Sequence, residues 1–442
     1  MTVPTVTPIV SPPLARPLVW PVLRQHLEDA AFCWLRRDTS LWLPTMRQEH
    51  LCRIDRLLEA HLFGLKLAAA AVLPQAQEQL QRWKTVDEVF VSTYLALQAD
   101  LDESTIAAVE HLLEDDPQCV RGAAAALLWT AHDAALPLLH RWWKSGNPVL
   151  RRAALPAALQ HPRINREAAV LDSLESGDAA LAARALRAIG EWRLEPHRER
   201  LKAAIRLADP LCRLESAYAL RLFGFDVHSD TTVAELIALD THGRRRMLLS
   251  IAATAKPARL RTTFDALLQA GEDRDALWLQ IFRGDAAAVD CLTAALDGPL
   301  ALLAAYGLQH VTGVDIDAER LWLNPDPMAP LPTPSTQADT SDDDHAHDDD
   351  ADADADADAE ARIHPEDAGL LPPDVAALRA WPAIQAAAHS GELLLAGQPA
   401  LTQIDKRDTT ELTLPQHWQL AFLRCQLGKA GALARIGMPA LI

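Results

Sequence analysis

The sequence predicts an all-α protein whose middle part is a stack of repeated helices. Three observations lead to this prediction: a composition that favours helix, amphipathic segments, and a repeat of fixed length. Apolar residues make up 49% of the 442 residues, and only 18 residues are glycine. Alanine and leucine are the most frequent of the apolar residues, and both lose little conformational freedom in a helix. The chain can therefore bury a large helical core.

The repeat appears as five helix-capping residues, each 31 positions after the last: Asp116, Asn147, Asp178, Asp209 and Asp240. An Asp or Asn at this position accepts hydrogen bonds from the free N–H groups of the first helical turn. Small residues follow the first four caps after seven and ten positions, and a core residue comes next. The small residues are Ala123, Ala154, Ala185 and Ser216, then Ala126, Ala157, Ala188 and Ala219.

A unit of about 30 residues holds two helices, and such a pair buries its apolar faces only by stacking on its neighbours. The sequence therefore predicts a HEAT-like α–α superhelix, with a last full repeat near residue 315. The alternative is a non-repetitive helical bundle whose spacings agree by chance. The expected domains are a disordered Pro-rich tail (1–17), an N-terminal helical cap (18–100), HEAT-like repeats (101–323), a disordered Pro-rich and then Asp-rich linker (324–364), and a small C-terminal helical module (365–442).

Charge is unevenly distributed along the chain. Between Asp339 and Glu360 there are twelve acidic residues and no basic ones, so that the net charge of −18 becomes −6 without them. Between Arg141 and Arg261 there are 21 basic and 13 acidic residues, a balance of +8. A dense run of like charge cannot form a packed core. We expect the acidic linker to be disordered, and it could fold back on the basic repeats.

The expected location is the cytoplasm. The six cysteines are far apart and form no CxxC pair, which is typical of reduced residues in a long intracellular chain. The first seventeen residues contain five prolines and no basic segment followed by an apolar helix, so they do not resemble a secretion signal. No stretch of about 18 apolar residues occurs, and we expect no membrane insertion.

Three stretches resemble a known family: residues 26–38 (HLEDAAFCWLRRD), residues 51–65 (LCRIDRLLEAHLFGL), and Pro373-Asp374 with Trp381 and Gly397. Together with the repeats they are similar to uncharacterised proteobacterial HEAT-repeat proteins encoded beside type VI secretion spike and effector genes. This resemblance implies a cytoplasmic accessory role in handling a secreted effector. It implies no catalytic residue, and the Asp-rich insertion departs from the family pattern.

Arginine is frequent in the repeats and provides the candidate partner-binding residues. They are Arg151, Arg184, Arg187, Arg213, Arg221, Arg244, Arg245 and Arg246. A row of such side chains would bind an acidic protein or phosphate groups. The alternative is structural, since arginine in repeat arrays also pairs with capping residues or carbonyl groups of the next unit. Arg121 and Arg152, both five positions after a cap, fit this structural role best.

The sequence contains no HExxH, GxSxG, P-loop or strand-linked GxGxxG motif. We therefore predict no catalytic residue, no cofactor and no metal site; His345 and His347 in the acidic run are expected to belong to a solvated spacer. The predicted function is a non-enzymatic scaffold or adaptor that binds a protein, such as a type VI effector or spike component. A nucleic-acid-binding repeat protein is the alternative, and a lyase similar to the HEAT-like chromophore lyases ranks last. The oligomeric state stays open.

Overall fold

The computed structural model describes residues 18–225, 227, 232–323, 364, 367, 370–406 and 409–429, and nearly all of their regular secondary structure is helical. They form two compact units. The first contains the described residues up to Leu35 together with Arg56–Arg141, and the second contains Arg36–Asp55 and the described residues from Trp142 onward. The predicted all-α fold class is confirmed. The expected disorder of 1–17 and 324–363 lies outside the described residues, as do His345 and His347.

The first unit is a bundle built around a buried central helix. Its elements are α1 (Trp20–Thr39), α2 (Gln48–Lys66), α3 (Ala69–Trp83), α4 (Val86–Gln98), α5 (Glu103–Asp115), η2 (Pro117–Cys119), α6 (Val120–Trp129) and α7 (His132–Lys144), of which α1, α2 and α7 continue into the second unit. Helix α4 is buried on nearly every side and packs against α3, α5 and α6. Gly122 permits the close approach of α6, because a Cβ atom there would lie 2.0 Å from the carbonyl oxygen of Val86.

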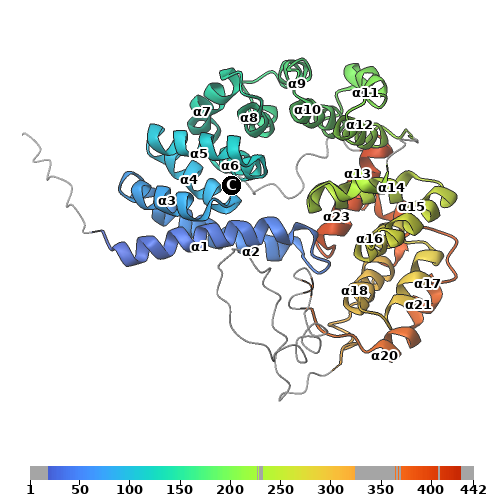
Figure 1. The fold of residues 1–442 in the computed structure, drawn as a ribbon. Coiled ribbons are helices and arrows are strands. Elements are labelled where there is room, and N and C mark those ends of the chain that lie inside the picture. The colour runs from blue at the N-terminus through green and yellow to red at the C-terminus, as the bar shows by residue number, and fades with distance from the viewer. Residues whose placement is uncertain are drawn as a thin grey trace, which may run out of the picture. The chain divides into compact units, whose positions relative to one another are not determined.

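The second unit contains two rows of helices (Figure 1). Row A comprises α9 (Arg166–Leu174), α11 (Arg198–Ala204), α13 (Val233–Ile237), α15 (Pro257–Gln269) and α17 (Ala286–Ala295). Row B comprises α8 (Pro148–Gln160), α10 (Ala179–Glu191), α12 (Pro210–Leu222), α14 (Thr241–Thr254), α16 (Asp273–Arg283) and α18 (Ala301–Thr312). Each row B helix packs on the next, and each row A helix packs on a row B neighbour. This arrangement is solenoid-like; the HEAT-type superhelix itself stays a prediction.

The predicted caps explain where the repeated helices begin. Asn147 accepts from Val149 N at 2.9 Å, and Asp178 accepts from Leu181 N at 2.7 Å. Asp209 and Asp240 do the same for Cys212 N and Gly243 N, each at 2.7 Å. Asp116 instead caps the short 3-10 turn η2 that leads into α6. All eight small residues predicted to lie between helices are buried.

Gly190 lies where α10 and α12 come closest. A Cβ atom at this position would lie 2.6 Å from Ala219 Cα and 2.7 Å from Ala219 Cβ, and neither atom can move without moving its helix. We expect Gly190→Ala to lower the free energy of unfolding by about 1–3 kcal/mol through overpacking. Chemical denaturation followed by circular dichroism measures this. Gly298→Ala, where the nearest atom is 3.5 Å away, is the matched control; equal effects of both changes would contradict the close approach.

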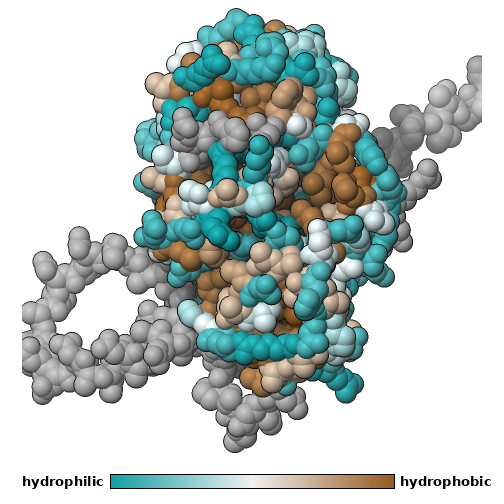
Figure 2. Space-filling model, turned by 90° about the vertical axis from the view of Figure 1, so that its right-hand side faces the viewer, coloured by the Kyte–Doolittle hydropathy of each residue, from teal (hydrophilic) through white to brown (hydrophobic). Residues whose placement is uncertain are grey.

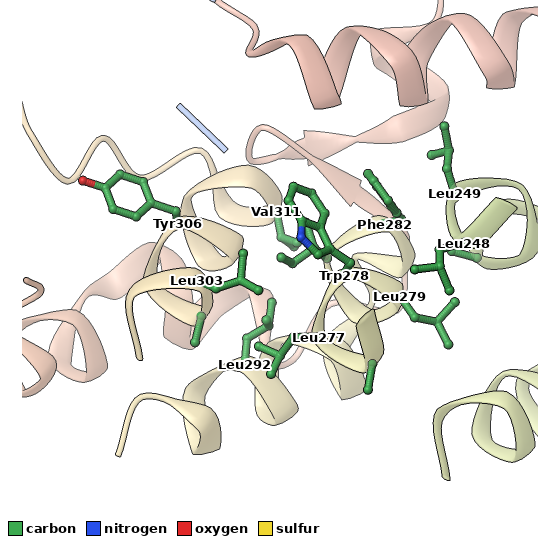
Figure 3. Close-up of a cluster of buried hydrophobic side chains, with 14 of the residues drawn as sticks. Leu248, Leu249, Leu277, Trp278, Leu279, Phe282, Leu292, Leu303, Tyr306 and Val311 are labelled. Carbon is green, nitrogen blue, oxygen red and sulfur yellow. The ribbon is translucent and has the colours of Figure 1, made fainter. Parts of the chain in front are cut away.

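Apolar side chains from rows A and B meet in one large core in the second unit. Figure 3 shows Leu248 of α14 beside Leu279 of α16, and Leu292 of α17 with Leu303 of α18 near Leu277 of α16. Trp278 and Phe282 of α16 lie 5.2 Å apart between ring centroids and are at most 1% exposed. Burial of this apolar surface is the main stabilising term for such a stack.

The C-terminal module packs against the ends of row B helices. It consists of α20 (Val375–Ala380), α21 (Pro382–Ala387), β1 (Leu394–Leu395), β2 (Gln398–Pro399), α22 (Ala400–Gln403) and α23 (Leu414–Gln426). On α23, Gln416 Nε2 donates to the His310 carbonyl oxygen of α18, and Gln419 Nε2 donates to the Phe282 carbonyl oxygen of α16, both at 2.9 Å. These bonds satisfy carbonyl groups that helix C-termini leave without partners.

The helical module predicted for this region also contains a short hairpin, β1–β2, which was not predicted from the sequence. Ala396 and Gly397 connect the two antiparallel strands, and both have positive φ angles (50° and 73°). Such a pair is the geometry of the tight turns that match the twist of a hairpin. The hairpin is also bonded to the end of the row B helix α16, because Leu394 N donates to the Gly284 carbonyl oxygen at 2.9 Å.

His310 makes the stability of the second unit depend on pH. Its side chain is 3% exposed, and its Nε2 lies 2.7 Å from Gln419 Oε1. Burial lowers its pKa from 6.5 to about 4, so the unfolded chain takes up a proton before the folded one does. The stability from a neutral His310 is complete above pH 6.5 and is lost as the pH falls toward 4.

We expect His310 to remove about 2 kcal/mol of the free energy of unfolding between pH 7.5 and pH 5.0, from 1.36 kcal/mol per pKa unit. Denaturation curves of the wild type and of His310→Gln at several pH values measure this contribution. The variant should show a flatter profile by that amount. Parallel profiles for the two proteins would show that His310 is not the responsible group.

The segment Arg36–Asp55, which joins α1 and α2, belongs to the second unit. It contains η1 (Ser40–Trp42), and Trp42 stacks on Trp418 of α23 with ring centroids 5.8 Å apart. Within the segment, Arg37 Nε donates to Asp55 Oδ1 at 2.6 Å between buried side chains. The predicted domain of residues 18–100 is therefore divided, because contacts with residues 200 or more positions away hold this segment.

None of the described helices alone is long and apolar enough to cross a membrane; α2 and α3 meet the length and composition only as a pair bent by 114°. All six cysteines lie in described residues and are free thiols, as expected. Burial raises the pKa of Cys119 and of Cys212 to about 12, so both remain protonated at neutral pH.

Candidate functional site

Two of the eight candidate arginines are buried and cannot contact a partner, which corrects the prediction for them. Arg221 is 2% exposed and donates to Ser250 Oγ at 3.2 Å. Arg245 is 3% exposed, pairs with Asp275, and lies 4.9 Å from the centroid of the Trp278 ring. Both therefore stabilise the packing of row B helices, which is the structural alternative for arginine in a repeat array.

Three further candidates connect neighbouring helices. Arg151, Arg213 and Arg244 each lie four residues after a cap. Their main partners are Asp172 of α9 at 2.5 Å for Arg151, Glu235 of α13 for Arg213, and Asp275 of α16 at 3.0 Å for Arg244. The Arg151 guanidinium also lies 5.1 Å from the centroid of the Trp143 ring. These three side chains therefore mainly hold neighbouring helices of the stack together.

The remaining three candidates, Arg184, Arg187 and Arg246, are brought together by the structure. They join Glu191 and Glu215 in a group that we call the charge cluster. Helix α10 supplies Arg184, Arg187 and Glu191, α12 supplies Glu215, and α14 supplies Arg246. The five side chains are between 7% and 21% exposed, so the cluster is mostly buried and only its outer edge reaches the solvent.

The repeat itself generates the cluster. Arg184, Glu215 and Arg246 are 31 residues apart and each lies six positions after its cap. Successive row B helices repeat the same packing, so residues at equivalent positions lie side by side. The charges of Arg184, Glu215 and Arg246 therefore alternate in sign along row B. Arg246 Nη2 donates to Glu215 Oε1 at 2.5 Å. Arg187 Nη1 lies 3.8 Å from the same oxygen.

Arg184 and Arg187 share one carboxylate. Glu191 Oε2 is 3.4 Å from Arg184 Nη1, and Glu191 Oε1 is 3.4 Å from Arg187 Nε. Burial and the neighbouring Arg187 lower the pKa of Arg184 to about 10, although Glu191 and Glu215 act to raise it. Burial acts to raise the pKa of Glu191, but Arg187 and Arg184 outweigh it and hold that pKa below its usual value. The acidic groups near Arg184 therefore do not fully offset its burial.

Tyr218 of α12 lies beside the cluster. The Arg246 guanidinium is 5.0 Å from the centroid of its ring, within the range of a cation–π contact. Burial raises the pKa of the Tyr218 hydroxyl well above its ordinary value, so the group remains neutral. Tyr218 therefore supports Arg246 from one side while Glu215 pairs with it from another.

The cluster contains three guanidinium groups and two carboxylates, which leaves one positive charge. Such a set can bind an anion by charge and hydrogen bonding. In the described part of the chain, no group of three or more His, Cys, Asp or Glu side chains could hold a metal ion. Sequence reasoning missed Glu191, Glu215 and Tyr218. The 31-residue spacing of Glu215 from Arg184 and from Arg246 was the signal that could have identified it.

The structural role inferred for Arg152 agrees with its surroundings. Burial lowers the pKa of its guanidinium, and the nearby Asp178, which caps the following row B helix, acts in the opposite direction. An arginine five positions after one cap therefore interacts with the cap of the next repeat.

Comparisons with known proteins do not assign the chain to a family. No protein-family model matches it, and neither a curated protein nor a solved structure matches it.

Proposed function

We propose that the protein is a non-enzymatic scaffold that binds another protein through row B. The observation that carries this proposal is the charge cluster, which spans three successive repeats and retains an accessible edge and one excess positive charge. Stacked helices offer a rigid surface on which equivalent positions repeat at fixed distance, and binding needs little rearrangement of such a surface.

The surface composition supports recognition by mixed contacts. On the face shown in Figure 2, hydrophobic areas lie between hydrophilic ones and are not joined into a single apolar surface. Protein–protein interfaces commonly combine apolar contacts with arginine and aromatic side chains. Arginine beside buried aromatic groups, as at Tyr218, is the kind of residue that contributes most to such binding.

The proposed partner is a type VI secretion effector or spike component, and the proposed location is the cytoplasm. Support comes from the resemblance of residues 26–38 and 51–65 to proteins encoded beside such genes. In the structure these two stretches pair with each other: His26 Nδ1 lies 2.9 Å from His61 Nδ1, and Arg37 pairs with Asp55. These four residues therefore have a structural role, because they connect α1 to α2.

The test is affinity purification of the tagged protein from the cells that produce it, followed by mass spectrometry. Enrichment of a spike or effector protein over an untagged control is expected. Recovery of nothing from the secretion system in cells that express it would remove the secretion role. Cell fractionation tests the cytoplasmic location.

Nucleic-acid binding is the second candidate, because the segment between Arg141 and Arg261 has a balance of +8. The geometry lends it less support, since most of the candidate arginines already pair with acidic groups inside the chain. Affinity for nucleic acid depends on basic groups that are available to neutralise phosphates. A filter-binding titration at about 50 mM salt, where phosphate contacts are strong, decides between the two. We expect no measurable retention of DNA or RNA.

A further inference from the structure

We propose that Arg184 and Arg187 of the charge cluster bind the carboxylate of an acidic side chain, Asp or Glu, on a partner protein. This inference rests on the proposed scaffold function and gives it a specific ligand chemistry.

The hydrogen-bonding capacity of the two guanidinium groups is largely unused. Each guanidinium carries five N–H donors. Among the described residues, Arg184 makes one hydrogen bond, a long one of 3.4 Å to Glu191. Arg187 makes ion pairs at 3.4 and 3.8 Å but no hydrogen bond to a described residue, and its buried Nε has no hydrogen-bond partner there. The other nitrogen atoms of Arg184 and Arg187 that lack a hydrogen bond are not among the buried ones, so an acceptor from a partner can reach them.

The adjacent repeat shows which acceptor fits. Arg246 Nη2 donates a hydrogen bond to Glu215 Oε1 at 2.5 Å, and the Arg246 guanidinium lies 5.0 Å from the centroid of the Tyr218 ring. Arg184 occupies the equivalent position one repeat before Glu215, and among the described residues its ion-pair partner is Glu191, which it shares with Arg187. Arg187 has a second, more distant carboxylate in Glu215 at 3.8 Å, and that oxygen already accepts from Arg246. One more side-chain carboxylate at the accessible edge would bring the carboxylates of the charge cluster to three, equal in number to its guanidinium groups. Arg184 would then no longer depend on the carboxylate that it shares with Arg187.

The same groups disfavour nucleic acid as the ligand. A nucleic-acid strand presents a regular run of phosphates, and the cluster would meet it with two carboxylates, Glu191 and Glu215, among its three arginines. Only one positive charge is in excess, which suits one carboxylate and not a series of phosphates. The proposed ligand is therefore a single acidic side chain of a protein.

The experiment uses the full chain labelled with [15N]arginine, and it follows the Nε–Hε signals of Arg184 and Arg187 during titration. The probe is the amidated peptide Gly-Ser-Glu-Glu-Ser-Gly; the reference is the amidated peptide with Gln in place of Glu. We expect a saturable shift of both signals with the Glu peptide and at least about a tenfold weaker response with the Gln peptide. Arg187→Gln should abolish the saturable shift of Arg184, whereas Arg198→Gln, at an arginine 40% exposed on α11, should not.

Other outcomes overturn the proposal. No saturable shift with the Glu peptide means that the cluster is structural only. A third peptide has Gln in place of Glu and a free C-terminal carboxylate. If only this peptide shifts the two signals, the ligand is a chain-terminal carboxylate and a side-chain carboxylate is excluded. A stronger response to a twelve-nucleotide oligothymidylate favours phosphate binding. Circular dichroism and the melting temperature verify that each variant is folded.

Failure of this inference and failure of the scaffold function are distinguishable. If a partner co-purifies equally with the wild type and with Arg187→Gln, the scaffold function stands and the carboxylate site is wrong. If the Glu peptide binds as expected but no protein of the secretion system is recovered, the site stands and the secretion role is wrong.

Discussion

Replacing Asp275 with alanine is expected to lower the free energy of unfolding of the second unit by about 3–5 kcal/mol. Asp275 lies in the first turn of α16 and is 4% exposed. Its Oδ2 accepts from Arg244 Nη1 at 3.0 Å, and its Oδ1 accepts from Arg245 Nη1. Because Arg245 is itself 3% exposed, the substitution leaves a guanidinium charge buried without its carboxylate partner.

Chemical denaturation at pH 7.5 of the wild type and of Asp275→Ala measures this loss. Asp273→Ala is the matched control, because Asp273 lies in the same first turn but is exposed. The control removes a favourable charge at a helix N-terminus and should cost no more than about 1 kcal/mol. A loss below 1 kcal/mol for Asp275→Ala as well would show that Arg245 is compensated by other groups.

The regular part of the fold was predictable because its determinants are local. Asn147, Asp178 and Asp209 accept hydrogen bonds from N–H groups two or three residues ahead, so the sequence alone shows where each helix begins. The small residues that let helices approach also recur at fixed positions after each cap. Gly190 did not match the predicted positions, yet it faces Ala219, which did.

The use of the arginines was not predictable from composition alone. A count of basic residues between Arg141 and Arg261 suggests a basic surface, but the count does not show which acidic residue faces each arginine. Stacking sets this: Arg244 meets Asp275, 31 residues later, and Arg246 meets Glu215, 31 residues earlier. The sequence read as an aligned set of repeats contains these pairs, whereas the sequence read as a linear charge profile does not.

The division of the N-terminal region between two units could not be predicted from local sequence patterns, for a different reason. Residues 36–55 have the same amphipathic character as their neighbours in α1 and α2. Their place in the second unit depends on contacts such as Leu414 N donating to the Met46 carbonyl oxygen at 2.6 Å. Pairings between residues that lie hundreds of positions apart carry no periodic signal.

The second large effect is expected for Trp42→Ala, with a loss of about 3–5 kcal/mol in the free energy of unfolding of the second unit. Trp42 is 7% exposed and belongs to the large core cluster. Its ring stacks on Trp418 and meets Phe282 edge-on with centroids 6.2 Å apart. Alanine would leave a cavity bordered by α16 and α23, and the lost contacts connect residues 36–55 to the rest of the unit.

Comparison with Trp42→Phe separates packing from hydrogen bonding. Trp42 Nε1 donates to His242 Nδ1 at 3.0 Å, so His242 accepts with Nδ1 and can donate from Nε2 to Asp38 Oδ2, 3.3 Å away. Phenylalanine keeps an aromatic ring but removes the donor, and a loss of about 1–2 kcal/mol is expected. Trp83→Ala, at a tryptophan 56% exposed on α3, should change the free energy by less than about 1 kcal/mol. If Trp42→Ala had no larger effect than Trp83→Ala in denaturation curves, the segment 36–55 would not be held by this ring, and its place in the second unit would need another cause.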